Sequence, residues 1–466
     1  MNPVALSRIA QWTGGRLHGA DAGGHDVLID AVVTDTRVFD TRDGSAALFV
    51  ALKGERFDGH DHVDAARVAG ARAALVSRVI ETPLPQLVVA DTERALASIA
   101  AAMQRARSGR VIAITGSNGK TSVKTLTLSI LRRAGSAYAN PGNRNNEIGL
   151  PLAVIEAPDG AEFAIYEMGA GKPGDIAYLT AIARPDIALV NNVAPAHLER
   201  LGSVHGVADT KGAIFDMLPA DGVAIVNADD AFADVFAQRA RTLPTRRVIR
   251  FGLDAAADVR AHDLRLNDDA SYFTLVTPLG EIAAMVPMSG RHSVANALAA
   301  AAIAIACGVA LEAIVIGLRD AQTIAGRLVR HRLGSGAVLI DDSYNANPGS
   351  LAAAIDTLAG AQGETWLVLG DMRELGADAP TLHAAAGARA RAAGIARLYA
   401  LGDLSAHAAT AFGDGGRAFA THAGLIDALR AELHGNIRVL VKGSRGSAMD
   451  RVVTALLDDG GMADVA

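Results

Sequence analysis

Seven consecutive residues combine glycines, hydroxyls and a lysine in a spacing that can hold phosphate. They are Gly116, Ser117, Asn118, Gly119, Lys120, Thr121 and Ser122. An apolar run (111–115) precedes them, and a pattern with helical period (120–133) follows. In a strand, glycine turn and helix of this kind, backbone N–H groups and the helix N-terminus hold a phosphate, the lysine reaches the terminal phosphates and the threonine binds Mg²⁺. The stretch therefore predicts an ATP site, rather than a glycine turn with an incidental lysine.

The loop has the short form Gly-x-x-Gly-Lys-Thr, because Ile114 stands where the longer phosphate-loop pattern has a glycine. Two further polar residues follow other apolar runs. Glu167 follows residues 163–166, where a carboxylate beside the phosphate strand can bind Mg²⁺ or cap a helix. His197 comes after residues 187–190 and is either a ligand or a hydrogen-bonded structural histidine. Its predicted position at the same sheet edge favours the ligand.

Lys211 begins a predicted helix whose apolar face contains Ile214, Phe215 and Leu218. An ammonium close to a magnesium site would repel the metal unless its charge were removed or reversed. From the residues alone, the favoured interpretation is a solvated surface lysine.

Later in the chain, polar residues gather at three places. Asn296 stands at the start of an alanine-rich helical pattern, and Arg327 follows Gly326 at the entry to a third α/β unit. Residues 341–348, which include Asp342, end the first strand of that unit and predict a ligand-facing loop, with an acidic turn and helix caps as the alternative. Near the N-terminus, the polar loops 34–37 and 53–60 each follow an apolar strand, where a ligand site and an ordinary solvated loop explain them equally well.

The chain has 466 residues, which is the length of about three domains. Its net charge of -6, without a basic stripe, argues against a nucleic-acid partner. The N-terminus lacks the charged flank and apolar core of a signal peptide, and the most apolar helical run (296–309) is too short and alanine-rich to span a bilayer. We therefore expect a cytoplasmic protein that does not insert into membranes.

Alternating strand and helix patterns predict an α/β fold with three domains. Residues 1–108 form a small N-terminal α/β domain in this interpretation. Residues 109–321 form a central domain with a phosphate loop on a doubly wound, mostly parallel sheet and an antiparallel appendage at 259–286. Residues 322–466 form a C-terminal Rossmann-like domain. The predicted strands of the two larger sheets are 111–115, 163–166, 187–190, 223–226, 337–340, 365–369, 397–401 and 437–441.

Four of these stretches together resemble a known family, the Mur ligases. They are residues 115–122, 167–169, 191–198 and 296–298. Mur ligases are ATP-dependent, amide-forming enzymes of bacterial cell-wall precursor synthesis, and folylpolyglutamate synthetase is a relative. Three more stretches (48–60, 142–151 and 341–348) resemble the branch of this family that joins D-alanyl-D-alanine to UDP-N-acetylmuramoyl-tripeptide, and residues 370–376 and 442–446 agree with it. The likeness covers nearly the whole chain.

The resemblance implies roles for particular residues. Thr36, Arg37 and Lys53 would hold the UDP part of the substrate, and Asn143, Asn145 and Asn146 would lie toward its sugar and peptide. Besides the loop residues 116–122, three residues would surround ATP: Asn296, Arg327 and Asp342. Lys211 matches a lysine that is carbamylated in several relatives, which would turn it into an anion facing the metal. The implied metal ligands are Thr121, Glu167, His197 and carbamylated Lys211, and the implied catalytic residues are Lys120, Glu167, His197, Lys211 and Arg327.

The resemblance also implies the reaction. The peptide carboxylate attacks the γ-phosphate of ATP, which gives an acyl phosphate, and the amine of D-alanyl-D-alanine then displaces phosphate. The expected partners are these small-molecule substrates, and a monomer is expected. Two alternatives stay open: another ligase of the family, which adds a different amino acid or extends folate with glutamate, and a nucleotide-driven switch whose ATP hydrolysis needs no amine.

Overall fold

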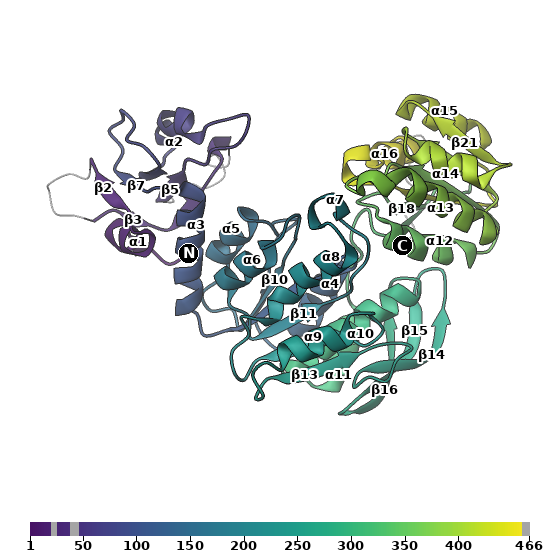
Figure 1. Cartoon of the computed structure of the whole chain (residues 1–466), viewed down its shortest axis with the longest axis horizontal. Helices are drawn as coiled ribbons and strands as arrows, with labels where there is room; N and C mark the ends of the chain where they lie inside the picture. Colours follow the sequence, from purple (N-terminus) through teal and green to yellow (C-terminus); the bar gives the residue numbers. More distant parts are fainter. Residues whose placement is uncertain (20–25, 38–45, 459–466) are drawn as a thin grey trace.

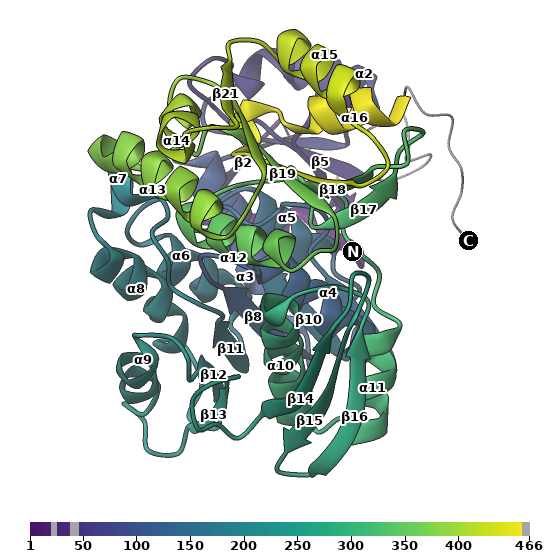
Figure 2. The same ribbon diagram turned by 90° about the vertical axis from the view of Figure 1, so that its right-hand side faces the viewer.

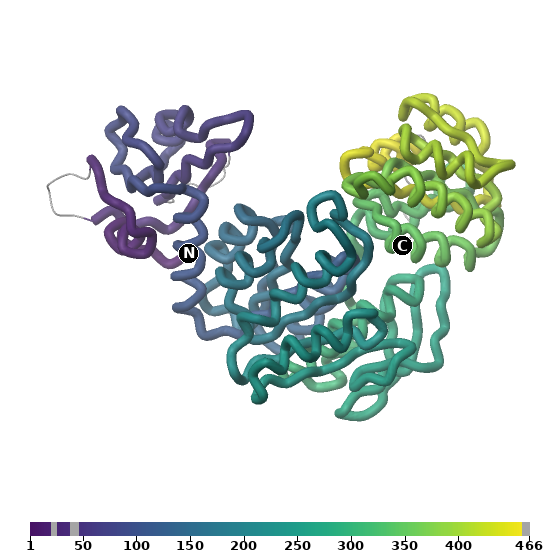
Figure 3. The backbone as a smooth tube through the Cα atoms, in the orientation of Figure 1, coloured from purple at the N-terminus to yellow at the C-terminus, as the bar shows by residue number. Residues whose placement is uncertain are grey.

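A computed structural model of the chain describes residues 1–19, 26–37 and 46–458. Three sheets of five or six strands follow one another along the chain, each with helices packed on it. Figure 1 shows the N-terminal and C-terminal sheets above opposite ends of the central part of the molecule, and the tube in Figure 3 shows the same arrangement. The predicted α/β fold is confirmed.

The N-terminal sheet has five strands in the order β2-β7-β6-β5-β4. Strands β4 to β7 are parallel and β2 pairs antiparallel with β7. Its elements are α1 (Leu6–Thr13), β2 (Arg16–His18), β4 (Ala31–Val33), β5 (Ala47–Val50), α2 (Val63–Val68), β6 (Ala73–Val76) and β7 (Gln86–Val88). A small antiparallel pair, β1 (Val4–Ala5) and β3 (Leu28–Ile29), lies beside it in the chain.

The central sheet has six parallel strands in the order β13-β12-β11-β8-β10-β9. These strands are β8 (Arg110–Thr115), β9 (Ala137–Ala139), β10 (Phe163–Glu167), β11 (Ile187–Val190), β12 (Val223–Asn227) and β13 (Arg247–Phe251). Because β8 lies between β10 and β11, the chain segments that leave the carboxyl ends of these three strands start at one edge of the sheet. This edge receives the phosphate loop, Glu167 and Asn191.

Helices cover both faces of the central sheet, and an antiparallel appendage follows it. The helices are α4 (Lys120–Leu131), α5 (Gly149–Glu156), α6 (Asp175–Ala183), α7 (Leu198–Leu201), α8 (Val204–Gly212), α9 (Ala233–Ala240), α10 (Arg291–Ala306) and α11 (Leu311–Arg319). The appendage is the three-stranded sheet β14 (Arg260–Leu266), β15 (Ser271–Thr277) and β16 (Gly280–Val286). This confirms the antiparallel appendage predicted at 259–286. Its strands lie beside α10 and α11 in Figure 2.

The C-terminal sheet has the order β17-β18-β22-β19-β20-β21, with only β17 antiparallel. Its strands are β17 (Val329–Arg332), β18 (Val338–Asp342), β19 (Glu364–Gly370), β20 (Arg397–Leu401), β21 (Gly416–Phe419) and β22 (Ile437–Lys442). The helices are α12 (Pro348–Ala359), α13 (Ala379–Ala392), α14 (Ser405–Phe412), α15 (His422–Glu432) and α16 (Asp450–Asp458). The predicted Rossmann-like sheet is confirmed, with two strands more than the pattern showed. Among the described residues, no helix is both long and apolar enough to cross a membrane.

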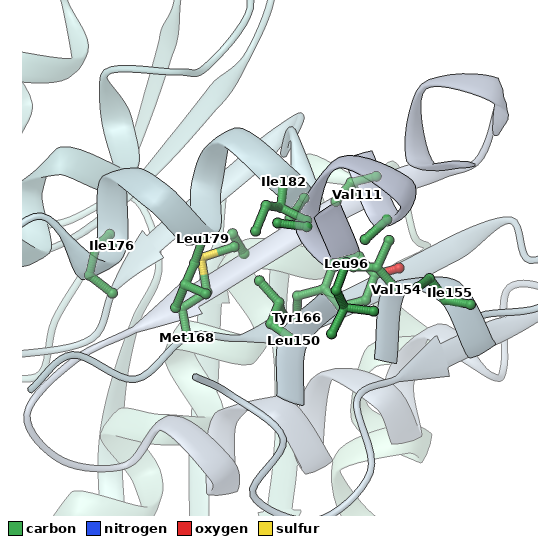
Figure 4. Close-up of a cluster of buried hydrophobic side chains, with 14 of the residues drawn as sticks. Leu96, Val111, Leu150, Val154, Ile155, Tyr166, Met168, Ile176, Leu179 and Ile182 are labelled. Carbon is green, nitrogen blue, oxygen red and sulfur yellow. The ribbon is translucent and has the colours of Figure 1, made fainter. Parts of the chain in front are cut away.

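Helix α3 (Thr92–Ala106) fixes the N-terminal sheet to the central sheet. Its residue Leu96 belongs to a buried cluster with residues of α5, α6 and β10 (Figure 4). At its C-terminal end, Gln104 accepts a hydrogen bond from the Tyr166 hydroxyl (3.1 Å), and Arg107 donates to the carbonyl of Ala157 (2.6 Å). No helix was predicted at residues 92–106. The boundary proposed near residue 108 therefore follows a helix that packs on both parts.

The C-terminal part contacts the central part through polar groups. Arg330 of β17 lies 3.2 Å from Asp268, in the turn between β14 and β15 of the appendage. The other contacts of this kind surround the phosphate loop. Because polar contacts exchange readily with water while a buried apolar cluster does not, we expect the C-terminal part to be the more easily displaced of the two.

The α3 cluster provides a stability test. Leu150 is fully buried in it, whereas Leu279 in the turn before β16 is 59% exposed. Leu150→Ala leaves a cavity, so it should lower the free energy of unfolding by about 2–5 kcal/mol. Leu279→Ala should change it by less than about 0.5 kcal/mol. Urea unfolding followed by circular dichroism measures both variants, and equal losses would contradict the packing described here.

Candidate active site

A cavity of about 640 Å³ opens between the central and C-terminal parts of the chain, a volume within the usual range for small-molecule sites. Most of the predicted site residues line it. These are Ser117, Asn118, Gly119, Lys120, Thr121, Ser122, Asn143, Asn145, Asn146, Glu167, His197, Asn296, Arg327 and Asp342. The structure thus brings together residues that are more than 200 positions apart in the sequence.

The phosphate loop has a backbone conformation that strongly favours glycine at its second glycine position. Gly119 has a φ of 77°, and a Cβ there would lie 2.4 Å from Asn296 Oδ1 and 2.5 Å from Asn191 Nδ2. The loop leads into the N-terminus of α4, where free N–H groups attract anions. Lys120 Nζ donates to the carbonyl of Gly116 (2.8 Å), so its charge lies over the loop.

Asparagine side chains hold this loop in place. Asn191 Nδ2 donates to the carbonyl of Asn118 (2.9 Å) and to Asn296 Oδ1 (3.0 Å). Asn192 Oδ1 accepts from the Asn118 amide (2.8 Å). Asn191 and Asn192 belong to one of the stretches that resemble the family, but no role was predicted for them. Their position directly after the strand beside β8 is the signal that could have found them.

Glu167 ends β10 with its carboxylate buried in the cavity wall. Its Oε1 accepts from Asn145 Nδ2 (2.9 Å), and Oε2 lies 3.2 Å from Lys124 Nζ. Burial opposes ionisation, but the charges of Lys124 and Lys120 outweigh it, and the pKa of Glu167 is lowered. Glu167 is therefore a carboxylate at neutral pH. Lys124 was not predicted as a site residue, although it lies one helical turn after Lys120.

These groups fit a magnesium ion that is bound together with a nucleotide. Glu167 Oε2 is buried and accepts no hydrogen bond from the described residues, and the cation that it faces is the Lys124 ammonium at 3.2 Å. Lys124 directs its hydrogen bonds to the carbonyls of Asn140 (3.0 Å) and Gly142 (3.1 Å) instead. Within the described part of the chain, no three acidic, histidine or cysteine side chains are grouped to hold a metal by themselves. Mg²⁺ commonly takes one or two protein ligands and completes its shell with phosphates and water.

His197 faces the cavity from the start of α7, with a φ of 53°. Its Nδ1 lies 2.5 Å from Glu374 Oε2 in the C-terminal part. Burial lowers the pKa of His197, and the charges of Lys211 and Lys120 add to this effect despite Glu374. The imidazole is therefore neutral at pH 7 and can act as a ligand or a hydrogen-bond donor. Glu374 could not be predicted from the sequence around it, because its partner His197 lies in another domain.

Lys211 is buried in α8, with 2% of its surface exposed, so the interpretation as a surface lysine is wrong. The helix turns this side chain inward with its apolar face. Burial and the nearby charge of Lys120 place the pKa of Lys211 well below its usual value. The ammonium forms no hydrogen bond with any described residue, and Lys211 is not part of the cavity lining. Its role as a metal ligand stays a prediction.

Two contacts connect the C-terminal part to the phosphate loop. Arg327 Nη2 donates to Thr121 Oγ1 (2.9 Å), and Asn347 Nδ2 donates to Asn118 Oδ1 (2.7 Å). Asp342 lies deeper, where Lys442 Nζ donates to its Oδ2 (2.6 Å). Burial raises the pKa of Asp342, and the charge of Lys442 works against this rise. Lys442 was quoted in a family motif but not predicted as a site residue.

Three predicted residues, Thr36, Arg37 and Lys53, lie in the N-terminal part, away from this cavity. Arg37 is exposed and pairs with Asp35 (2.6 Å), and Lys53 is exposed in a β-bridge with Asp58. They therefore belong to a separate region, as the division of the substrate between domains implied. Their contacts with UDP stay predictions.

Comparisons with known proteins agree with this geometry. Three models of the family match the chain: a Mur ligase catalytic domain at 44–106, a Mur ligase middle domain at 114–304 and a Mur ligase glutamate ligase domain at 326–445. A UDP-N-acetylmuramoyl-tripeptide--D-alanyl-D-alanine ligase from Escherichia coli is 43% identical over 463 residues, which cover 99% of this chain and 100% of that protein.

Solved structures are also similar to the whole chain. A crystal structure of MurF from Acinetobacter baumannii superposes with a TM-score of 0.91 at 33% identity, covering 98% of this chain and 99% of the other. MurF ligase from Thermotoga maritima in complex with ADP gives a TM-score of 0.81 at 26% identity, covering 92% and 97%. The order of the three domains, the cavity between the second and third of them, and these full-length matches lead to one conclusion: the chain belongs to the Mur ligase family.

Proposed function

We propose that this chain is an ATP-dependent ligase that joins D-alanyl-D-alanine to UDP-N-acetylmuramoyl-tripeptide, with Mg²⁺. The full-length identity of 43% to an enzyme of that name carries this proposal. The enzyme acts in the synthesis of bacterial peptidoglycan precursors, and we propose that it does so in the cytoplasm as a monomer. Each of the three domains takes one part of the reaction, with proposed boundaries near residues 108 and 321.

The reaction must bring an anionic carboxylate to a polyanionic triphosphate. This approach is electrostatically unfavourable in a cavity from which water is displaced. Lys120 belongs to the phosphate loop, and Arg327 contacts that loop from the C-terminal part through Thr121. Their charges offset the repulsion as the carboxylate attacks the γ-phosphate, and the loop N–H groups hold the phosphates in line.

Thr121 and Glu167 would hold Mg²⁺, with His197 as a further ligand. When bound, the metal supplies positive charge that neutralises the phosphate oxygens. Asn145, which donates to Glu167 Oε1 in this structure, keeps that carboxylate directed toward the loop. Asn143 and Asn146 lie on the same wall and are proposed to contact the sugar and peptide of the substrate.

The product of the first step is an acyl phosphate, which water would destroy. The cavity has one wall from each of two domains, so its closure depends on the C-terminal domain. Two hydrogen bonds join that domain to the phosphate loop, Arg327 with Thr121 and Asn347 with Asn118. We propose that it closes once the substrates are bound, which excludes water from the acyl phosphate, and that it opens to release product.

The reaction itself is tested by its product. The enzyme is incubated with ATP, Mg²⁺, UDP-N-acetylmuramoyl-tripeptide and D-alanyl-D-alanine, and mass spectrometry should detect the tripeptide substrate extended by the dipeptide, with one ADP formed per product. Parallel reactions contain single amino acids, or dihydrofolate with glutamate. The proposal would be rejected if product formed only with another acceptor, or if ADP were released without any amine present.

Arg327 is tested by removing its charge. Arg327→Ala should lower kcat/KM for ATP by about 10²-fold or more, because a charge that faces the transferring phosphate is lost. Arg319→Ala removes the same side chain from the exposed end of α11, where it pairs with Asp320 (2.8 Å), and should leave the kinetics unchanged. Coupled assay of ADP release measures both. If Arg327→Ala and Arg319→Ala have equal kcat/KM values for ATP, the proposed role of Arg327 is excluded.

Lys211 is proposed to be carbamylated. Its lowered pKa leaves a larger fraction of neutral amine at neutral pH, and the neutral amine is the form that adds CO₂. With ¹³C-bicarbonate, the enzyme should show one carbamate carbon signal that is missing in Lys211→Arg, and this variant should be nearly inactive. Lys172→Arg, at a lysine whose side chain is 62% exposed, should retain signal and activity. A fully active Lys211→Arg enzyme would contradict the proposal.

A further inference from the structure

Arg327 lines the cavity beside the phosphate loop. The described residues provide no carboxylate that pairs with it, and its buried Nε has no hydrogen-bond partner. Asp342 lies near enough for the charge of Arg327 to affect its pKa, but this carboxylate is paired with Lys442 at 2.6 Å. An arginine on a long, flexible side chain must still be held in one direction to act on a phosphate.

The aromatic ring of Tyr344 is positioned to keep the guanidinium in one orientation. The guanidinium carbon of Arg327 lies 4.5 Å from the centre of the Tyr344 ring, within the range of a cation–π contact. The two residues are also joined through the backbone, because the Tyr344 amide donates to the carbonyl of Gly326 (3.1 Å). Gly326 has a φ of 74°, and a Cβ there would lie 3.1 Å from Tyr344 Cβ, so the segments before Arg327 and around Tyr344 are closely packed.

We propose that Tyr344 is the positioning residue of Arg327, whose guanidinium it directs across the domain boundary toward Thr121 and the ATP phosphates. An aromatic face attracts a guanidinium without cancelling its charge, whereas a carboxylate partner would orient it and neutralise it. Arg327 Nη2 already points at Thr121 Oγ1 (2.9 Å) in this structure, on the side of the loop where phosphate binds. The inference rests on the proposed function, because it takes ATP as the ligand that Arg327 binds.

The first experiment compares three variants by steady-state kinetics of ADP release. Tyr344→Leu should lower kcat/KM for ATP about 10-fold, because a cation–π contact of ordinary strength is lost. Tyr344→Phe keeps the ring and should stay within about 2-fold of the parent enzyme. Tyr272→Leu, at a tyrosine of β15 that is 38% exposed, is the matched control and should change nothing. The KM for D-alanyl-D-alanine should be unchanged in all three. Equal losses in the Leu and Phe variants, or no loss in either, would overturn the proposal.

A double-mutant cycle identifies the partner of the ring. The guanidinium carbon of Arg445 lies 5.9 Å from the centre of the same ring, so Tyr344 could also act through Arg445. In an Arg327→Ala background, Tyr344→Leu should have no further effect on kcat/KM for ATP. A full additional 10-fold loss in that background would assign the ring to another partner and overturn the proposal. If Arg327→Ala by itself leaves the use of ATP unchanged, the proposed function of Arg327 fails, which is a different result.

A series of isosteric rings covers the case in which Tyr344→Leu does not fold. Phenylalanine, 3,5-difluorophenylalanine and 3,4,5-trifluorophenylalanine are placed at position 344, so that the shape of the ring is nearly constant while the negative charge of its face decreases. The kcat/KM for ATP should fall at each step of fluorination, and the melting temperature should not. Constant kinetics across the series would show that the ring acts only by its shape and would overturn the proposal.

Discussion

The requirement that shapes this protein is electrostatic: cations from two domains must face one polyanionic ligand. Lys120 comes from the phosphate loop, and Arg327 reaches that loop from the third domain, where it donates to Thr121 Oγ1 (2.9 Å). The central domain provides the charge of Lys120, and the C-terminal domain provides the charge of Arg327. In the proposed mechanism Arg327 contributes only while the two domains are in contact, so this charge distribution would couple domain closure to catalysis.

The order of the central strands explains why the remaining groups meet the same ligand. β8 lies between β10 and β11, so the phosphate loop, Glu167 and the pair Asn191 and Asn192 leave the sheet at one edge. The asparagines hold the loop backbone, and Glu167 stays ionised because Lys124 and Lys120 are close to it. Helix α3 keeps the N-terminal domain attached by apolar packing (Figure 4), while the third domain is attached by polar groups that can separate.

The local sequence pattern was sufficient to predict features that depend on residues close together in the chain. The apolar run 187–190 is the strand Ile187–Val190, and Glu167 and Asp342 line the cavity because they stand at the ends of strands. Asn296 lines it from the second turn of α10. The burial of Lys211 could not be predicted, since it depends on how α8 packs. The partnerships of Glu374 with His197 and of Tyr344 with Arg327 depend on distant segments. Helix α3 was missed although Asp91 provides a recognisable N-cap.

A crystal structure of the enzyme with a non-hydrolysable ATP analogue and Mg²⁺ tests the central claim most directly. This account predicts that the triphosphate lies on the loop 116–122, with Lys120 Nζ released from the Gly116 carbonyl and with both Lys120 and Arg327 about 3 Å from phosphate oxygens. Density that places the phosphates away from this loop, or Arg327 outside hydrogen-bond distance while the two domains are closed, would contradict it.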